Sequence, residues 1–202
     1  MSERLDLPIL GQEIRERSDA ARNREALLEA AARLVERCGV EAVTMDAVAE
    51  AALVGKGTVF RRFGSRAGLM AALLNQSEAS WQAQVMGGPP PLGPGAPPWE
   101  RLLAFGRSRL EVNIRHAALI NAASAPSTRS YAAYSFTATH VRYLLDQLRV
   151  AGDIALLATA LLAPLESPIL LQQTEIENMD VERIAAGWED LAERIIAHRR
   201  EP

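Results

Sequence analysis

One stretch, from Thr44 to Leu69, constrains the fold of this chain more than any other: TMDAVAEAALVGKGTVFRRFGSRAGL. Thr44 is a good N-cap, because its hydroxyl accepts hydrogen bonds from the free N–H groups of a first helical turn. The small residues Ala49 and Ala52 allow a second helix to cross closely. The segment Leu53-Val54-Gly55 that follows them has about the length of a helix-turn-helix corner. The stretch therefore predicts two short helices joined by a tight turn, with a third helix following.

The second helix of this pair is expected to present a basic face. Gly55 can cap it, and Val59 and Phe63 turn inward at helical spacing. Its N-terminal turn, with Gly57 and Thr58, is slim enough to approach base edges. Cationic side chains gather over its outward face and just beyond it, with no acidic residue among them: Lys56, Arg61, Arg62 and Arg66. Such a face suits the closely spaced phosphates of duplex DNA, and a helix of this diameter fits the major groove.

A set of positions in this stretch follows an order and spacing known from one family: Thr44, Val48, Ala49, Ala52, Val54, Gly57, Thr58, Val59, Phe60, Phe63, Ser65, Arg66 and Leu69. The pattern resembles the DNA-binding domain of the TetR family of transcriptional regulators, over about residues 19–75. The resemblance implies a helix-turn-helix that reads the major groove, a following helix that donates to a phosphate, and a C-terminal helical domain that binds a ligand and dimerises. We expect the DNA-binding residues to be Thr44, Lys56, Gly57, Thr58, Phe60, Arg61, Arg62 and Arg66.

The chain departs from the family pattern at the turn and in the second helix. Leu53 stands where the family usually has glycine in a left-handed backbone conformation, which costs a leucine roughly 1 kcal/mol. Gly55 and Phe60 replace the common serine and tyrosine, so two hydroxyl donors to phosphate are missing, and Arg62 is the candidate replacement for one of them. A second interpretation therefore stays open: a helical small-molecule-binding or scaffold protein with a degenerate helix-turn-helix that no longer binds DNA.

The whole chain is predicted to be all-α, with about nine helices. Its 202 residues, about half of them hydrophobic, suffice for a small DNA-binding unit and a larger helical core. We expect a flexible N-terminal arm (1–17), a helix-turn-helix domain (18–65) and a ligand-binding and dimerisation domain (66–202). The last domain begins with a connecting helix (66–85) and a Pro/Gly-rich loop (86–98). The net charge of −3 does not by itself indicate a nucleic-acid binder, but DNA binding needs only local positive potential.

The first helix is expected to begin at Ser18 or Asp19 and to run to Cys38. Arg22 and Arg24 near its start are either phosphate contacts or solvated surface charges. Cys38 is the lone cysteine, so disulfides within the chain are excluded. We interpret it as a small buried hydrophobe at the helix end, with a redox-sensing thiol as the alternative.

A ligand pocket is predicted in the C-terminal domain. Arg109 lies within an apolar stripe of the helix that begins near Trp99, and a buried guanidinium needs a partner, either a protein carboxylate or an anionic ligand. The following helix, about Thr128 to Val150, holds the densest aromatic run of the chain. Aromatic bodies with polar tips are typical of small-molecule pockets, although each could equally be ordinary core. The expected ligand-binding residues are Phe105, Arg109, Val112, His116, Tyr131, Tyr134 and His140.

The last two helices are predicted to dimerise. Asp153 caps a long apolar helix in which Pro164 and Pro168 predict a kink, and Asp180 caps the final helix. The resemblance implies that two such helices from each subunit pair in a four-helix interface, which places two recognition helices about one DNA turn apart on a palindrome. The expected interface residues are Leu157, Leu161, Leu165, Ile184, Trp188, Leu191 and Ile195.

Enzymatic chemistry finds no support in the sequence. The three histidines, His116, His140 and His198, have no close-spaced partners, and no serine stands in a nucleophile-elbow context. We expect no catalytic residue, no metal and no cofactor. The charged N-terminus and the absence of a long apolar run predict a cytoplasmic protein. The predicted function is a dimeric, sequence-specific transcriptional regulator, a repressor that a small-molecule effector releases from a palindromic operator.

Overall fold

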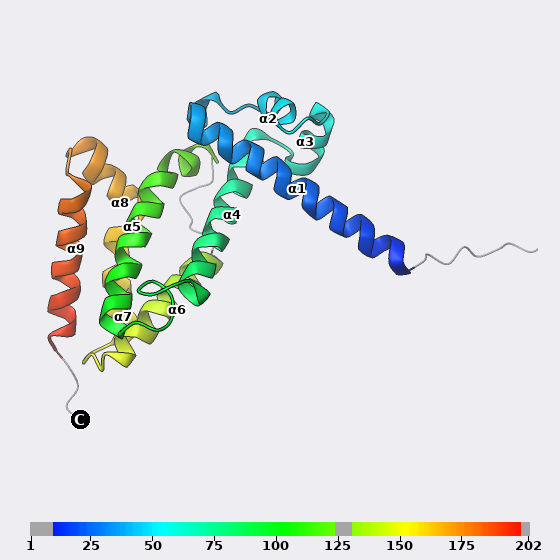
Figure 1. Cartoon of the computed structure of the whole chain (residues 1–202). Helices are drawn as coiled ribbons and strands as arrows, with labels where there is room; N and C mark the ends of the chain where they lie inside the picture. Colours follow the sequence, from blue (N-terminus) through cyan, green and yellow to red (C-terminus); the bar gives the residue numbers. More distant parts are fainter. Residues whose placement is uncertain (1–9, 124–130, 199–202) are drawn as a thin grey trace, which may run out of the picture. The chain divides into compact units, whose positions relative to one another are not determined.

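The computed structural model describes residues 10–123 and 131–198, and within these ranges the chain folds into nine α-helices and short helical turns (Figure 1). The prediction of an all-α fold with about nine helices is confirmed. The chain divides into two compact units, residues 1–73 and 74–202. The division falls inside one helix, α4 (Arg66–Gly87), whose first turns belong to the first unit.

The first unit contains α1 (Leu10–Cys38), a single 3-10 turn η1 (Val40–Ala42), α2 (Met45–Ala51) and α3 (Lys56–Phe63). The predicted caps are present. The Ala47 N–H donates to Thr44 Oγ1 at 3.1 Å, Gly55 is the N-cap of α3, and the Gly68 N–H donates to Ser65 Oγ at 3.1 Å. α2 packs against both α1 and α3, which is the helix-turn-helix arrangement that the sequence predicts.

The core of the first unit is small and aliphatic. Val48 of α2 and Val59 of α3 are fully buried, and they share this core with Leu27 and Ala31 of α1 and Leu69 of α4. Alanines fill several of the remaining buried positions, so the helices approach closely.

Two expectations for α1 are wrong. The helix begins at Leu10 rather than at Ser18, because residues 12–17 (QEIRER) are all acceptable helix formers with no proline among them; residues 1–9 of the predicted arm lie outside the described residues. Cys38 is exposed rather than buried. Gly39, with φ 76°, ends α1 at this point, and Val40 of η1 takes the buried position that the sequence assigns to the cysteine.

The corner between α2 and α3 has the backbone that the family pattern implies. Leu53 has φ 55°, in the left-handed region, and its side chain is 93% exposed. The Val54 N–H donates to the carbonyl of Ala49 at 2.9 Å and closes the end of α2. Leu53 therefore bears the strain of roughly 1 kcal/mol that glycine would avoid, without burying its side chain in return.

The second unit contains the rest of α4, α5 (Pro98–Ala122), α6 (Tyr131–Gln147), α7 (Ile154–Leu162), α8 (Ser167–Leu171) and α9 (Val181–Ile196). No helix forms between Gly87 and Pro98, as the prolines and glycines of that segment predict. Asp153 and Asp180 cap α7 and α9 as expected. The predicted break lies between α7 and α8, where the 3-10 turn η2 (Ala163–Leu165) contains Pro164 and the path bends by 40°.

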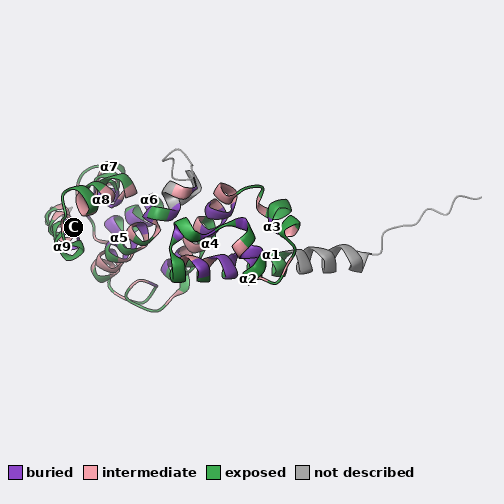
Figure 2. Ribbon diagram, turned by 90° about the horizontal axis from the view of Figure 1, so that it is seen from above, coloured by how far each residue is buried: buried purple, intermediate pink, exposed green. Residues whose placement is uncertain are grey.

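α5 is central to the second unit, because it packs against α6, α8 and α9. Phe105 and Leu102 of α5 are fully buried, while Leu110 and Arg109 are nearly so, which confirms that this helix is buried on two sides. Figure 2 shows buried positions along α5, whereas α9 also carries many exposed ones. α5 and α9 cross closely at Gly106, whose missing side chain leaves room for the indole of Trp188.

Several side chains predicted for a dimer interface lie in this core instead. Leu161 and Leu165 are fully buried, and Ile184 and Trp188 are 7% and 4% exposed. Within one chain these four side chains pack against α5 and its neighbours. Leu157, Leu191 and Ile195 are only partly buried.

No single helix of the described residues is long and apolar enough to cross a bilayer. A bent pair, Ile154–Leu165 with Ser167–Ile176, reaches that length and composition when its two parts are taken together. Apolar core helices pass the same test, and Leu161, Leu162, Leu165 and Leu170 of this pair belong to the hydrophobic core.

Candidate DNA-binding surface and buried polar cluster

The outer face of α3 carries the predicted cationic side chains. Lys56, Arg61 and Arg62 are all exposed, and α3 is drawn mainly as exposed in Figure 2. The opposite face of α3 packs into the core through the buried Val59 and the half-buried Phe63. The guanidinium of Arg24 lies over the Phe63 ring, 5.9 Å from its centroid. The basic groups therefore project from a helix whose orientation the core determines. Arg24, one of the two undecided charges of α1, has a structural contact.

Lys56 is not free in the structure. Its ammonium Nζ lies 2.5 Å from the carboxylate Oδ2 of Asp46, a residue in the first turn of α2. The side chains are 68% and 56% exposed, so this ion pair contributes little to stability. It does place a negative charge beside the first residue of the candidate reading helix, where a DNA phosphate would have to compete with it.

Arg66 has a structural role that the sequence does not indicate. Its Nε and Nη2 groups donate to the backbone carbonyls of Val43 and Val40 at 2.8 and 2.6 Å, and the guanidinium lies 3.6 Å from the Glu41 carboxylate. It therefore ties the start of α4 to the η1 segment. This use engages two of its donor groups before any phosphate is present.

The remaining residues predicted for DNA binding lie at the start of α2 and in α3. Thr44 is exposed, but its hydroxyl accepts the capping hydrogen bond of α2. A side chain added at Gly57 would meet no atom within 4 Å, so the N-terminal turn of α3 is open as expected. Thr58 is half-buried, and Phe60 is 49% exposed. Phe60 thus presents an apolar surface beside the cationic one.

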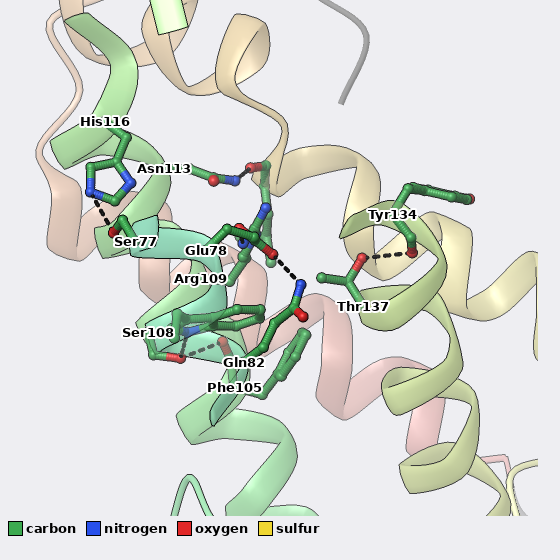
Figure 3. A network of polar contacts seen from close by, with 12 residues as sticks. Ser77, Glu78, Gln82, Phe105, Ser108, Arg109, Asn113, His116, Tyr134 and Thr137 are labelled. Atoms are coloured by element: carbon green, nitrogen blue, oxygen red, sulfur yellow. Dashed lines mark hydrogen bonds and ion pairs between the residues drawn. The ribbon is translucent and has the colours of Figure 1, made fainter. Parts of the chain in front are cut away.

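A buried polar cluster lies between α4 and α5 in the second unit (Figure 3). Arg109 is 3% exposed, and its Nη1 lies 2.6 Å from Oε2 of Glu78. Gln82, one turn further along α4, donates to the other carboxylate oxygen at 3.0 Å. The guanidinium also stacks over Trp81, 4.7 Å from the ring centroid. Of the two partners that the sequence leaves open for Arg109, the structure contains the protein carboxylate.

Aromatic rings continue the cluster toward α6. The imidazole of His140 stacks on Phe105 with centroids 5.2 Å apart, and on Phe136 at 6.2 Å. Its Nε2 is buried without a hydrogen-bond partner among the described residues, and so is the Nε of Arg109. Burial, assisted by the charge of Arg101, lowers the pKa of His140 from 6.5 to about 4, so the ring is neutral at physiological pH.

The other predicted ligand residues are more scattered. His116 is hydrogen-bonded to Ser77 Oγ at 3.0 Å, and burial lowers the pKa of its imidazole. The Tyr134 hydroxyl reaches Thr159 of α7 at 3.5 Å, and Val112 is half-buried against the core. The side chain of Tyr131 lies outside those that the structure describes. The structure thus brings Phe105, Arg109 and His140 together and leaves the rest around them.

Three residues of the cluster were not among the ligand-binding residues predicted from the sequence: Glu78, Trp81 and Gln82. All three lie on α4, which is treated there only as a connection. The sequence does contain a signal for this contact: Glu78 is the only acidic residue in this helix, and an isolated carboxylate is a candidate partner for a buried arginine. No group of three or more metal-ligating side chains occurs among the described residues.

The protein should lose stability in acid through His140. The unfolded histidine takes up a proton near pH 6.5 but the folded one only near pH 4, so the unfolded state binds more protons between these values. Stability is therefore fully present above the unfolded pKa and falls as the pH drops through this window, by about 3 kcal/mol in total. Urea unfolding of the wild type and of His140→Gln across the window measures the effect. Equal pH dependence in both proteins would show that His140 is not its source.

The fold and this surface together define a class of protein. A short α2, a tight corner and an α3 with an exposed basic face form a helix-turn-helix, set in a chain whose remaining described residues form a larger helical unit. The class is that of helix-turn-helix DNA-binding proteins with an additional helical domain.

Comparison with known proteins narrows this class to a family. Residues 27–73 match the family described as "Bacterial regulatory proteins, tetR family". No match was found among curated protein sequences. The matched segment is the helix-turn-helix unit, from α1 to the first turns of α4, and this unit is a DNA-binding domain of the TetR type.

Solved structures share the fold over nearly the whole length. A TetR-family transcriptional regulator from Pectobacterium atrosepticum is 20% identical, with a TM-score of 0.68 over 92% of this chain and 98% of that one. A TetR-family regulator from Rhodococcus sp. is 16% identical, with a TM-score of 0.59 over 87% and 99% of the two chains. The multidrug binding protein EbrR, solved with imidazole, is 24% identical, with a TM-score of 0.55 over 84% and 89%. These similarities establish the fold of both units.

Proposed function

We propose that this regulator is a cytoplasmic, dimeric repressor that binds a palindromic operator through α3 and is released by a small-molecule effector. The observation that carries the proposal is the exposed cationic face of α3, held in place by the buried Val59. A helix with basic side chains on its outer face and a slim first turn can enter the major groove and contact phosphates on either side.

Support for dimerisation comes from exposed apolar side chains on the last helices. Leu156 of α7 is 68% exposed, Ile169 of α8 is 40% exposed, and Val181 at the start of α9 is 38% exposed. A second copy could cover such side chains, together with the partly buried Leu157, Leu191 and Ile195 that the sequence nominates. Two copies would also supply the two recognition helices that a palindrome requires.

Support for an effector comes from the cluster around Arg109 and His140. Its aromatic rings and buried polar atoms without partners are the combination that small-molecule sites use. EbrR, which shares the fold, is described as a multidrug binding protein. Binding at this cluster and at DNA would be coupled reciprocally, typically by about 1–3 kcal/mol.

The first test is binding of the full-length protein to duplex DNA flanking its own gene, over a salt series, with a random duplex as control. We expect tighter, saturable binding to the flanking DNA and a steep salt dependence. Arg61→Gln and Arg62→Gln should each weaken binding and lower the salt slope by about one unit for each phosphate that is no longer neutralised. If both variants bind DNA as the wild type does, α3 is not the reading helix. That result would favour the alternative function, a small-molecule-binding or scaffold protein with a degenerate helix-turn-helix.

Removing the carboxylate beside Lys56 should strengthen DNA binding. Asp46→Asn releases the lysine and removes a negative charge from the proposed phosphate-binding face, so we expect affinity to rise roughly fivefold at low salt and less at high salt. The matched control is Asp190→Asn in α9, which breaks an equally exposed pair with Arg194 far along the chain. Equal DNA affinity of both variants would show that Lys56 does not contact the DNA.

A further inference from the structure

The guanidinium of Arg66, in the first turn of α4, is bound by the protein at two of its nitrogens. Nε donates to the carbonyl of Val43 at 2.8 Å, and Nη2 donates to the carbonyl of Val40 at 2.6 Å. Both valines are buried, and they stand at the start of η1 and directly after it. Because the two nitrogens belong to one planar group, both hydrogen bonds form only when η1 and the start of α4 keep a fixed spacing.

The carbonyl of Val43 depends on this contact. Val43 has an extended backbone, with φ −81° and ψ 112°, and it lies between η1 and Thr44, the N-cap of α2. No backbone N–H of the described residues donates to its carbonyl. Val43 is fully buried, and a backbone carbonyl that is shielded from water destabilises the fold when it has no donor. Arg66 therefore supplies a hydrogen bond that neither η1 nor α2 supplies.

The contact of Arg66 reaches the candidate reading helix through α2. Val43 directly precedes the N-cap of α2, and α2 packs against α3. At its other end, α3 leads through Gly64 and Ser65 into α4. The helix pair is thus attached to α4 twice, once by the chain after α3 and once by the side chain of Arg66 at the start of α2. Without the second attachment, the orientation of α2 and α3 depends on the core packing alone.

We propose that Arg66 is a positioning residue for DNA recognition and not a phosphate contact: it holds η1 and the start of α2 against α4 and thereby sets the orientation of α3. The inference rests on the proposed DNA binding through α3. If the guanidinium turned its Nε and Nη2 groups toward a phosphate, the buried carbonyl of Val43 would lose its donor. The carboxylate of Glu41, 3.6 Å from Nη2, also opposes the approach of a second anion.

Hydrogen exchange of the full-length protein without DNA gives the first test. Arg66→Lys keeps the charge but replaces the planar group by a single ammonium, which does not reproduce both hydrogen bonds. We expect amide exchange in residues 40–48 to become about tenfold faster, while α5 and α9 exchange as in the wild type. Glu41→Gln is the control and should leave exchange unchanged, because it removes only an ion pair with an exposed carboxylate. Unchanged exchange in Arg66→Lys would overturn the proposal.

DNA binding, measured well below the melting temperature of each variant, separates positioning from phosphate contact. The probes are the duplex that flanks the gene and the random duplex. If Arg66 positions α3, Arg66→Lys should bind the flanking duplex about tenfold more weakly and the random duplex as the wild type does. Arg66→Met should show the same loss of selectivity and keep the wild-type salt slope, because no neutralised phosphate is lost.

A phosphate contact predicts a different result for Arg66→Met. Binding to both duplexes would then weaken alike, and the salt slope would fall by about one unit. That result would overturn the proposal, and so would wild-type selectivity in Arg66→Lys. If the wild type itself does not prefer the flanking duplex, the proposed function fails, and hydrogen exchange alone then decides whether Arg66 holds η1 and α2 in place.

Discussion

Glu78→Gln is expected to lower the free energy of unfolding by about 3 kcal/mol. The substitution keeps the shape of the side chain and removes only its charge, so the guanidinium of Arg109, which is 3% exposed, loses the carboxylate 2.6 Å away. Breaking a buried ion pair on one side costs about 3–5 kcal/mol, and the partial exposure of Glu78 places this case at the lower end. Urea unfolding at neutral pH measures the difference.

The matched control is Glu182→Gln in α9. Glu182 pairs with Arg107 at 3.2 Å, but its side chain is 78% exposed, so we expect a change below about 1 kcal/mol. Adding Arg109→Met to Glu78→Gln should restore part of the lost stability, because the unpaired buried charge is then gone. Equal effects of the two Glu→Gln variants would show that the pair around Arg109 is not shielded from water.

Gly106→Ala is expected to destabilise the protein by about 2–3 kcal/mol. A Cβ at this position would overlap the Cη2 and Cζ3 atoms of Trp188, which is 4% exposed and fixed by its hydrogen bond to Leu161. The indole cannot move aside without breaking that bond, so the α5–α9 crossing must open. Thermal and urea unfolding report the loss, and the fluorescence of Trp188 should change with it.

Gly187→Ala is the control for the helix propensity of alanine. Both glycines lie inside helices, but the Cβ at Gly187 meets open space. Alanine there should raise stability by about 0.5–1 kcal/mol, since glycine is unfavourable in a helix interior. Opposite signs for the two Gly→Ala variants are therefore expected. If Gly106→Ala is neutral or stabilising, α5 and α9 do not cross as closely as the structure shows.

Local features of the fold were predictable because their causes are local. Thr44, Asp153 and Asp180 cap helices through hydrogen bonds within three residues, and the sequence shows each cap directly. The break around Pro164 follows from residue type in the same way, whereas the left-handed backbone of Leu53 was expected only from the resemblance to the family pattern. Cys38 was mispredicted because its exposure depends on how the chain turns at Gly39, beyond the end of the helical pattern.

The candidate sites were predictable in part. The basic face of α3 follows from spacing alone, but the pairing of Lys56 with Asp46 and the backbone contacts of Arg66 depend on how α2, η1 and α4 meet. Neither contact has a sequence signal, because each joins residues of separate elements. Similarly, periodicity marks Ile184 and Trp188 as apolar without saying whether the chain itself or a second copy covers them.

The sequence by itself determined the all-helical class, the helix-turn-helix and its basic face, since these depend on periodicity, capping and charge within a few turns of helix. Only the tertiary structure decided that Arg109 is paired with Glu78, that Trp188 closes onto Gly106, and that Arg66 binds the backbone on both sides of η1. The physical reason is the same in each case. Packing and ion pairing join residues that are distant in the chain, and their partners are defined only once the helices have been placed against one another.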